Sequence, residues 1–360
     1  MMKKLYSVIK GSGCYIPEKR VLNEDFINKD FYESDGNKIN IPNEEIIRKF
    51  EKITDIKERR HVTDDLVASD IACFAAKDAI INSGIDKESL DYIIVAHNFG
   101  DVKKNNKRSD FVPSLAARVK NKLGIKNPKT ISFDLAFGCP GWLMGIIQAD
   151  YILRSGDAKR ALIIGTETLS RISDPHDRDS MLYSDGAGAT ILEAIESNEP
   201  VGILSHASRS DTLNHAFLLW MGKSNNPDYK GDELFLKMNG RKLYEYALDT
   251  VPLVVKENLE KANIALEQVE KLLIHQANAK MDDAILARLF KLYNKAEIPE
   301  NIMPMTIAEL GNSSVATVPT LVSLLFNNKF SNHKVTSGNI LVFASVGAGM
   351  NINSLIYKIP

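Results

Sequence analysis

The sequence contains no long hydrophobic run. Nowhere in its 360 residues do roughly 18 apolar residues follow one another, so we expect no membrane-spanning helix. The opening segment, MMKKLYSVIKGSGCYIP, has basic residues, but its apolar run is too short and too interrupted for a signal peptide. Both absences favour a protein of the cytoplasm.

Cysteine is scarce. The three cysteines, Cys14, Cys73 and Cys139, lie in unrelated contexts and have no metal-ligand spacing. We therefore expect no metal site, and the natural compartment is a reducing cytoplasm. Cys14 and Cys73 are most simply small buried hydrophobic residues.

An excess of either charge is also missing. Lys and Arg number 45 and Asp and Glu 46, which gives a formal net charge of -1, so nothing global predicts nucleic-acid binding. The hydrophobic content of 44% and the charged content of 25% are typical of globular proteins. The length allows two domains or one large duplicated domain.

The most informative stretch is residues 130–153, TISFDLAFGCPGWLMGIIQADYIL. Its first residues predict a buried strand, and the almost entirely apolar segment from Trp142 to Leu153 predicts a buried helix. Pro140 is expected at the first helical position, which makes Cys139 the N-cap. A thiol at a helix N-terminus favours the thiolate and suits a nucleophile. The alternative is a small buried cysteine in a tight turn.

Other segments have clear secondary-structure signals. We expect strands at 5–11, 90–96, 160–165 and 187–192, with a turn at 11–13 and a polar loop at 101–110. Helices are expected at 43–52, from a cap at Ser69 to Gly84, and at 113–123.

The second half of the chain repeats the plan of the first. The segment from Ser83 aligns with that from Ala262, and each ends with an apolar strand that delivers a histidine. A second alignment places Cys139 opposite Asn312. We expect an α/β protein with halves at 1–198 and 199–360, in which the Cys139 helix and its counterpart lie buried between two mixed sheets.

Three residues occupy matching positions in this plan: Cys139 and Asn312 at helix starts, and His275 at the end of the strand LLIHQAN. Ends of strands and helices hold catalytic groups rigidly. Alone, a histidine at a strand end is more often structural, and an asparagine N-cap is an ordinary device. Their coincidence indicates a site.

The sequence resembles the β-ketoacyl-acyl carrier protein synthase III family of the thiolase superfamily over nearly its whole length. Motifs in family order carry the resemblance: IKERR from Ile56, DLAFGCPGW around Cys139, SRISDPHDR from Ser170, SDGAGA from Ser184, HQAN from His275, GNSS from Gly311 and SVGAG from Ser345. The resemblance implies a duplicated, thiolase-like αβαβα five-layer fold, a homodimer and a Cys139–His275–Asn312 triad.

The resemblance also implies the chemistry. Cys139 accepts an acyl group, and His275 and Asn312 assist a decarboxylative Claisen condensation with a malonyl or β-ketoacyl thioester. The backbone N–H groups of Cys139 and Ala348 form the oxyanion hole, with Gly347 beside them. Asn278 also contacts substrate. No cofactor is needed, and the partners are acyl carrier protein and acyl thioesters of fatty acid, specialised lipid or polyketide biosynthesis.

Some positions depart from the family pattern. Lys49 and Ile53 stand where the primer-binding form has the tryptophan and arginine that sandwich the adenine of coenzyme A. Val112 replaces a bulky phenylalanine that the dimer partner contributes to the acyl pocket, and Phe111 lies beside it. These changes favour a longer or branched acyl group delivered by a carrier protein.

Two basic sets complete the predicted site. Arg171 matches the arginine at the phosphate end of the coenzyme. Lys280 and Arg288 fall near the family's entrance, where they would steer an acidic carrier protein or simply solvate a helix face.

Three alternatives remain at this level. A papain-like hydrolase has the same Cys, His, Asn order but lacks an internal duplication. A related acyltransferase could form an ester or amide without condensation. The chain could also be a partner subunit of a hetero-oligomeric condensing enzyme, although its intact triad argues against a non-catalytic subunit.

Overall fold

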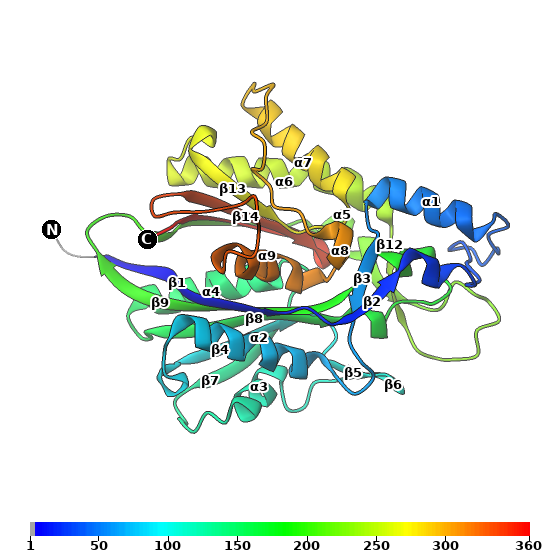
Figure 1. The fold of residues 1–360 in the computed structure, drawn as a ribbon, viewed down its shortest axis with the longest axis horizontal. Helices are drawn as coiled ribbons and strands as arrows, with labels where there is room; N and C mark the ends of the chain where they lie inside the picture. Colours follow the sequence, from blue (N-terminus) through cyan, green and yellow to red (C-terminus); the bar gives the residue numbers. More distant parts are fainter. Residues whose placement is uncertain (1–3) are drawn as a thin grey trace.

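The computed structural model describes residues 4–360 and contains two large β-sheets (Figure 1). The N-terminal sheet has the strand order β1-β9-β8-β4-β7, and the C-terminal sheet the order β10-β15-β14-β13. The strands of the first sheet are β1 (Lys4–Tyr15), β4 (Tyr92–His97), β7 (Ile131–Ala136), β8 (Arg160–Thr168) and β9 (Asp185–Ser197). Those of the second are β10 (Gly202–Ser210), β13 (Val269–Ile274), β14 (Ile340–Gly347) and β15 (Asn351–Lys358).

Helices form three layers around these sheets. α4 (Gly141–Ser155) and α9 (Thr317–Phe326) lie between the two sheets (Figure 1). α2 (Ala68–Ser83) and α3 (Leu115–Leu123) cover the outer face of the first sheet, and α6 (Gly240–Ala262) and α7 (Ala279–Leu292) cover that of the second. The five-layered αβαβα fold expected from the sequence is confirmed.

The remaining α-helices and strands lie near one end of the sheets. They are α1 (Asn43–Thr54), α5 (Thr212–His215), α8 (Ile307–Leu310), β2 (Lys19–Leu22), β3 (Glu58–His61), β5 (Asp101–Lys103), β6 (Asn106–Asp110), β11 (Leu219–Gly222) and β12 (Phe235–Met238). Among residues 4–360, no helix is both long enough and apolar enough to cross a bilayer.

The central core joins the two halves. Trp142 and Ile146 of α4 and Leu321 of α9 belong to one buried cluster with strand residues of both sheets, such as Ile163 and Phe343. Neither helix can expose an apolar face without uncovering a sheet, so the two sheets and the two central helices bury one another. The predicted burial of the Cys139 helix is confirmed.

Trp142 makes this core testable. Its side chain is 2% exposed, and its ring centroid lies 6.4 Å from that of Phe343. Because Trp142→Ala leaves a cavity between the sheets, we expect the free energy of unfolding to fall by about 3–5 kcal/mol. Urea denaturation measures the loss. Gln148→Ala on the exposed side of α4 is the control and should cost no more than about 0.5 kcal/mol; equal losses would contradict the central position of Trp142.

Several sequence predictions were wrong in detail. The predicted turn at residues 11–13 is part of β1. The glycine at 13 serves close packing instead, since a Cβ there would lie 2.4 Å from the backbone nitrogen of Ala79 in α2. Ser69 does not cap α2, whose N-cap is Val67. The hydroxyl of Ser69 donates a hydrogen bond to the carboxylate of Asp101 instead. The polar segment at 101–110 forms the β5–β6 hairpin.

The strand before Cys139 also differs from the prediction. β7 is an edge strand that pairs with β4, and Ile131 is 50% exposed, so this strand is not buried in the single chain. α4 begins at Gly141 with Pro140 as its N-cap. Cys139 therefore precedes the N-cap by one residue, on the turn that leads into the helix.

Candidate active site

Cys139 lies where the two halves of the fold are in contact. A Cβ on Gly347, at the end of β14, would come within 2.6 Å of the backbone nitrogen of Cys139. A Cβ on Gly138 would lie 2.9 Å from the backbone nitrogen of Ala348. These two glycines allow the turn before α4 and the end of β14 to pack with their backbones in contact. The backbone N–H groups assigned to the oxyanion hole are thus near one another.

Cys139 is half-buried, and its sulfur contacts one hydroxyl. Its Sγ lies 3.2 Å from Oγ of Ser314. Burial raises the pKa of the thiol to about 11, although the contact with Ser314 acts in the opposite direction. The sequence predicts a thiol that ionises easily at a helix N-terminus, whereas in the structure burial has the largest effect on the pKa and favours the neutral thiol.

Asn312 is connected to Cys139 through the same serine. Its Oδ1 accepts a hydrogen bond of 2.9 Å from the backbone N–H of Ser314. This bond fixes the carboxamide so that Nδ2, the donor that a substrate carbonyl needs, is not the atom held by the backbone. An isolated β-bridge to Tyr183 holds the backbone of Asn312.

His275 follows β13 directly. Its backbone N–H donates to the carbonyl of Ala344 on the parallel neighbour β14, at 2.9 Å. Because the two parallel strands end at the same edge of the sheet, His275 is at the same end as Gly347 and Ala348. Its Nδ1 is buried without a hydrogen-bond partner among residues 4–360. Burial lowers the pKa of the imidazole to about 4, so it is neutral at pH 7.

The low pKa of His275 predicts a pH-dependent stability. Unfolded, the imidazole titrates near 6.5, so between about pH 6.5 and 4 the unfolded state binds a proton that the folded state does not. The free energy of unfolding should therefore fall as the pH falls through this window, by about 3 kcal/mol at its lower end. Urea denaturation of the wild type and His275→Gln at pH 7 and pH 4.5 measures this contribution.

A comparison with the variant is needed because Glu167 acts in the opposite direction. Burial raises the pKa of its carboxyl to about 7, so the folded state binds the proton first and gains stability as the pH falls below 7. The wild type should lose more stability than His275→Gln between the two pH values. Equal changes in both proteins would contradict the neutral imidazole.

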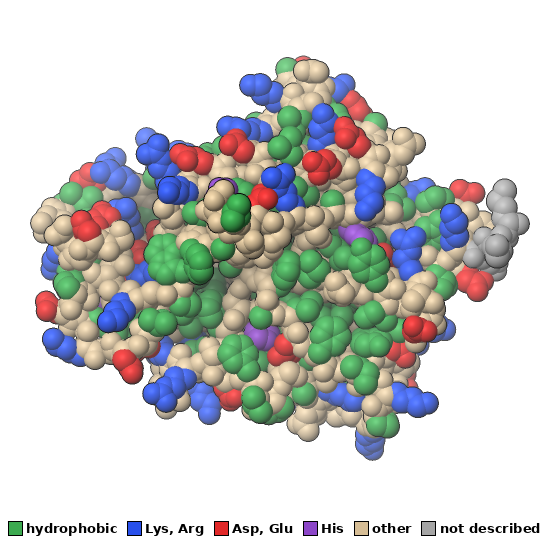
Figure 2. All heavy atoms as spheres, turned by 180° about the vertical axis from the view of Figure 1, so that it is seen from behind, with side chains coloured by type: hydrophobic (Ala, Val, Ile, Leu, Met, Phe, Trp, Pro, Cys, Tyr) green, Lys and Arg blue, Asp and Glu red, His purple; other side chains and the backbone are tan. Residues whose placement is uncertain are grey.

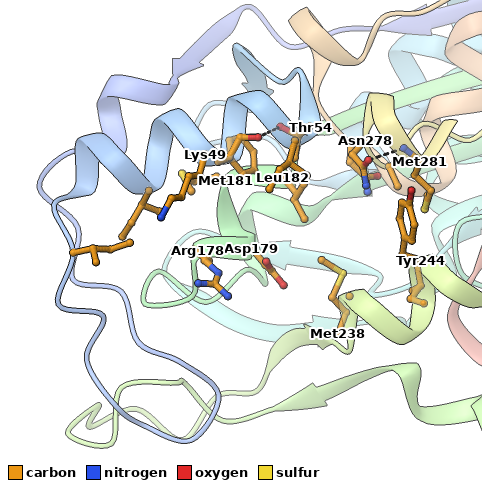
Figure 3. A pocket seen from close by; sticks show the side chains of 18 residues that line it. Lys49, Thr54, Arg178, Asp179, Met181, Leu182, Met238, Tyr244, Asn278 and Met281 are labelled. Carbon is orange, nitrogen blue, oxygen red and sulfur yellow. Dashed lines mark hydrogen bonds between the residues drawn. The ribbon is translucent and has the colours of Figure 1, made fainter. Parts of the chain in front are cut away.

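Two cavities meet this region. The smaller one, of about 210 Å³, contains the thiol and is lined by Asn98, Phe99, Gly138, Cys139, Leu169, Leu219, Trp220, Met221, Leu236, Ser314 and Ala348. The larger one, of about 490 Å³, is mainly apolar and reaches Asn312 from the side of α1, α6 and α7 (Figure 3). Cys139 and Asn312 thus border different cavities. Ser314 connects the two residues, because its hydroxyl contacts the sulfur and its backbone N–H donates to the carboxamide.

The larger cavity holds several of the predicted residues. Lys49 and Ile53 of α1 and Asn278 all line it. Asn278 caps α7, because its Oδ1 accepts from the backbone N–H of Met281 at 2.9 Å (Figure 3). The two positions that depart from the family pattern, 49 and 53, therefore border this cavity.

Arg171 does not belong to this cavity. The residue is 2% exposed, and its Nη2 donates to the carbonyl of Thr63 at 2.8 Å and to that of Leu66 at 3.3 Å. Because the side chain is buried and its Nη2 holds this loop, Arg171 is not placed to meet a phosphate in the cavity, and the sequence prediction for Arg171 is corrected. Arg178, in the same SRISDPHDR motif, lines the cavity instead (Figure 3).

The remaining predicted residues lie at the surface. Phe111 stacks near His97, with ring centroids 5.8 Å apart, and Val112 is 85% exposed. Their predicted role requires a second subunit and stays a prediction. Lys280 is exposed at the start of α7, whereas Arg288 pairs with Asp249 of α6. That ion pair reduces the charge Arg288 could offer to a carrier protein.

The sequence reasoning missed Ser314, Arg178 and Asp179. Ser314 is the last residue of the quoted GNSS motif, and its contact with the sulfur depends on a left-handed backbone conformation, with φ of 53°, that no motif spacing reveals. Asp179 directly follows the quoted SRISDPHDR motif. Burial raises the pKa of its carboxyl to about 7, an unusual value for a carboxyl that lines a cavity.

Two family models and several solved structures match this chain. The family model described as 3-oxoacyl-[acyl-carrier-protein] synthase III matches residues 133–212, and the model of its C-terminal part matches residues 259–359. The 3-oxoacyl-[acyl-carrier-protein] synthase III of Aquifex aeolicus VF5 is 27% identical with a TM-score of 0.76, over 98% of this chain and 99% of that chain.

Two further solved structures are similar. The β-ketoacyl-[acyl carrier protein] synthase III of Thermus thermophilus is 27% identical, with a TM-score of 0.80 over 98% of this chain and 99% of that chain. The priming β-ketosynthase from the R1128 polyketide biosynthetic pathway shares the fold at 23% identity, with a TM-score of 0.81 over 100% and 98% of the two chains. With the family models covering both the turn at Cys139 and the segments of His275 and Asn312, this chain belongs to the 3-oxoacyl-[acyl-carrier-protein] synthase III family of thiolase-like condensing enzymes.

Proposed function

We propose that the protein transfers an acyl group from a thioester to Cys139 and then condenses it with a malonyl or β-ketoacyl thioester. The observation that carries the proposal is the junction at Ser314, which joins the sulfur of Cys139 to the carboxamide of Asn312. A nucleophile and a carbonyl-binding donor are thereby held at fixed positions, each on the wall of its own cavity.

In the first step, the sulfur of Cys139 attacks the thioester carbonyl, and the carrier thiolate leaves with the proton lost from Cys139. The carbonyl oxygen becomes an anion in the tetrahedral intermediate. The backbone N–H groups of Cys139 and Ala348 are the proposed donors to this anion, and the close packing at Gly347 supports their convergence. Losing one such donor typically costs about 2.7–4 kcal/mol of barrier.

In the second step, a malonyl thioester loses CO₂, and its carbonyl oxygen gains the negative charge of an enolate. The neutral imidazole of His275 and Nδ2 of Asn312 are the proposed donors to this oxygen. The carbanion attacks the acyl carbon on Cys139, a carbon–carbon bond forms, and the sulfur leaves. This step needs donors and no general base, which suits a buried imidazole that is not protonated at pH 7.

We further propose that the acyl donor is a carrier-protein thioester and that its acyl group is longer than acetyl or branched. The large cavity supports this: Lys49 and Ile53 line it at the positions aligned with the family's adenine-binding tryptophan and arginine, and the aromatic residues of its lining, Phe50 and Tyr244, stand at other positions. Its interior is mainly apolar and suits the slender arm of a carrier better than a nucleotide.

Intact mass spectrometry tests donor and reaction together. The protein is incubated with acetyl-coenzyme A, or with acetyl, octanoyl or dodecanoyl acyl carrier protein, and the mass added to Cys139 is followed. Malonyl carrier protein is then added, and released CO₂ and β-ketoacyl product are measured. Efficient priming by acetyl-coenzyme A would contradict the proposed donor. An acyl-enzyme that passes its group to an alcohol or amine without CO₂ release would identify an ester- or amide-forming transferase, and no acylation without a second chain would indicate a partner subunit.

We also propose a homodimer that forms across the edge strand β7. Within residues 4–360, β7 pairs only with β4 and leaves Ile131 50% exposed. Figure 2 shows hydrophobic side chains over much of one face, with lysines and arginines mostly at its margins. Edge strands and large apolar areas are typical of protein interfaces.

Light scattering tests this assembly. The wild type should have twice the mass of one chain, and Ile131→Lys should shift the protein toward the monomer by placing an ammonium group in the interface. Ile81→Lys, at a position 74% exposed on α2, is the matched control and should remain dimeric. A dimer unaffected by either change would contradict the proposed interface.

A further inference from the structure

A buried glutamate is connected to Cys139 through two side chains that the reaction scheme does not use. Glu167, near the end of β8, is fully buried. Its Oε2 accepts hydrogen bonds from the backbone N–H and from Nδ2 of Asn98, at 2.9 and 2.6 Å. Nδ2 of Asn98 also lies 3.3 Å from Oγ of Ser314, which contacts the sulfur. A continuous chain of four side chains thus runs from the carboxylate to the nucleophile.

The chemistry of the four groups gives this chain a direction. A carboxylate only accepts hydrogen bonds, so the amide of Asn98 must present its NH₂ group to Glu167. The same NH₂ group carries a second hydrogen, which is directed at the oxygen of Ser314. With that oxygen occupied as an acceptor, the hydroxyl hydrogen of Ser314 is free to point to Sγ of Cys139.

We propose that Glu167 is a positioning residue which, through Asn98, makes the hydroxyl of Ser314 a hydrogen-bond donor to the sulfur of Cys139. The donor stabilises the thiolate as the carrier thioester arrives, and again when the sulfur leaves during condensation. This inference rests on the proposed role of Cys139 as the nucleophile.

The backbone at Ser314 supports the proposal independently. Its φ of 53° lies in the left-handed region, which residues other than glycine rarely adopt. The strained conformation places the hydroxyl against the sulfur while the backbone N–H of the same residue holds Asn312. Strain of this kind is found where a site requires a fixed geometry.

The charged state of Glu167 fits this role near neutral pH. Its pKa is raised to about 7 by burial, while Asn98 and the neighbouring His97 act in the opposite direction and Asp185 of β9 adds to the increase. Above pH 7 the carboxylate form prevails, and this form fixes the direction of the chain.

Electrostatics and hydrogen bonding predict opposite effects of removing this charge. The negative charge of Glu167 by itself raises the pKa of the Cys139 thiol. If charge alone mattered, Glu167→Gln would make the thiol more acidic. If the hydrogen-bond chain dominates, the glutamine can donate to Asn98, the amide loses its fixed orientation, and the thiol becomes less acidic.

Alkylation of Cys139 by iodoacetamide, followed by peptide mass spectrometry across a range of pH, measures this acidity without any substrate. We expect Glu167→Gln to react about tenfold more slowly than the wild type at pH 8, the effect of losing one hydrogen bond to a charged group. Ser314→Ala should slow the reaction to a similar degree, and the double variant should be no slower than Ser314→Ala alone. Glu193→Gln, which removes a buried carboxylate of β9 in the same sheet, is the matched control and should not change the rate.

An unchanged or faster alkylation in Glu167→Gln would overturn the proposal, and so would additive effects of the two substitutions. Circular dichroism establishes that each variant is folded; if Glu167→Gln is not, Asn98→Ala breaks the same chain and must slow alkylation. Because the readout needs no thioester, a wild type that never becomes acylated would refute the proposed function while leaving this inference standing.

Discussion

Cys139→Ala is expected to abolish formation of the acyl-enzyme and to lower the condensation rate by a factor on the order of 10⁶, the scale observed when a hydrolase loses its nucleophile. The acyl group needs a covalent site while the first carrier leaves and the second thioester enters. Alanine offers no such atom. The fold should remain intact, because the hydrogen bond found for this sulfur is the one to Ser314.

Intact mass and product formation measure the loss, and the two other cysteines provide controls. Cys73 is 3% exposed beside α3, and Cys14 lies in β1 against α2 and α9. Alanine at either position should leave acylation of the protein unchanged. An acyl group that still appears on Cys139→Ala protein would place the nucleophile elsewhere and would contradict the proposed mechanism.

The fold was predictable because its main features are repeated in the sequence. The two aligned segments ending in histidine form the strands β4 and β13, which pair in parallel with β8 and β14; β7 is added beyond β4, whereas β13 is the edge of its sheet. The segment after Cys139 is almost entirely apolar, so the helix that it forms must be buried on every face. That helix, α4, does lie between the sheets. Repeats and periodicity thus determine layers well, because burial follows directly from them.

The details of the site were less predictable because they depend on atoms brought from distant parts of the chain. The thiol of Cys139 was expected to ionise easily at a helix N-terminus, but its burial by residues of both halves has the larger effect on its pKa. The guanidinium of Arg171 is used by the carbonyls of residues more than a hundred positions away. Neither competition can be read from local sequence.

The same limit explains why the contact between Ser314 and Cys139 went unnoticed. Asparagine at a helix start predicts a cap, and Asn312 does accept the backbone N–H two residues later. That bond, together with the positive φ of Ser314, turns the next side chain toward the sulfur. The motif GNSS therefore carries a geometric function that becomes visible only with the opposite half of the fold present.

Asn312→Asp should separate the two halves of the reaction. The aspartate keeps an oxygen where Oδ1 accepts from Ser314, so the local backbone should be retained, but it replaces the Nδ2 donor with a second anionic oxygen. An enolate would then face a negative charge instead of a donor. We expect CO₂ release from malonyl carrier protein to fall by at least about 10²–10³-fold, the cost of one lost oxyanion donor.

Acylation of Cys139 should persist in this variant because the tetrahedral intermediate of that step is assigned to the backbone N–H groups of Cys139 and Ala348. Single-turnover mass spectrometry follows acyl transfer, and released CO₂ reports decarboxylation, so each step has its own readout. Asn312→Ala is the comparison: it loses the same donor but also leaves the N–H of Ser314 without its acceptor, and it should therefore lose stability as well as activity. If Asn312→Asp loses acylation and decarboxylation to the same degree, the carboxamide serves the geometry of Cys139 and is not the donor that distinguishes condensation from simple acyl transfer.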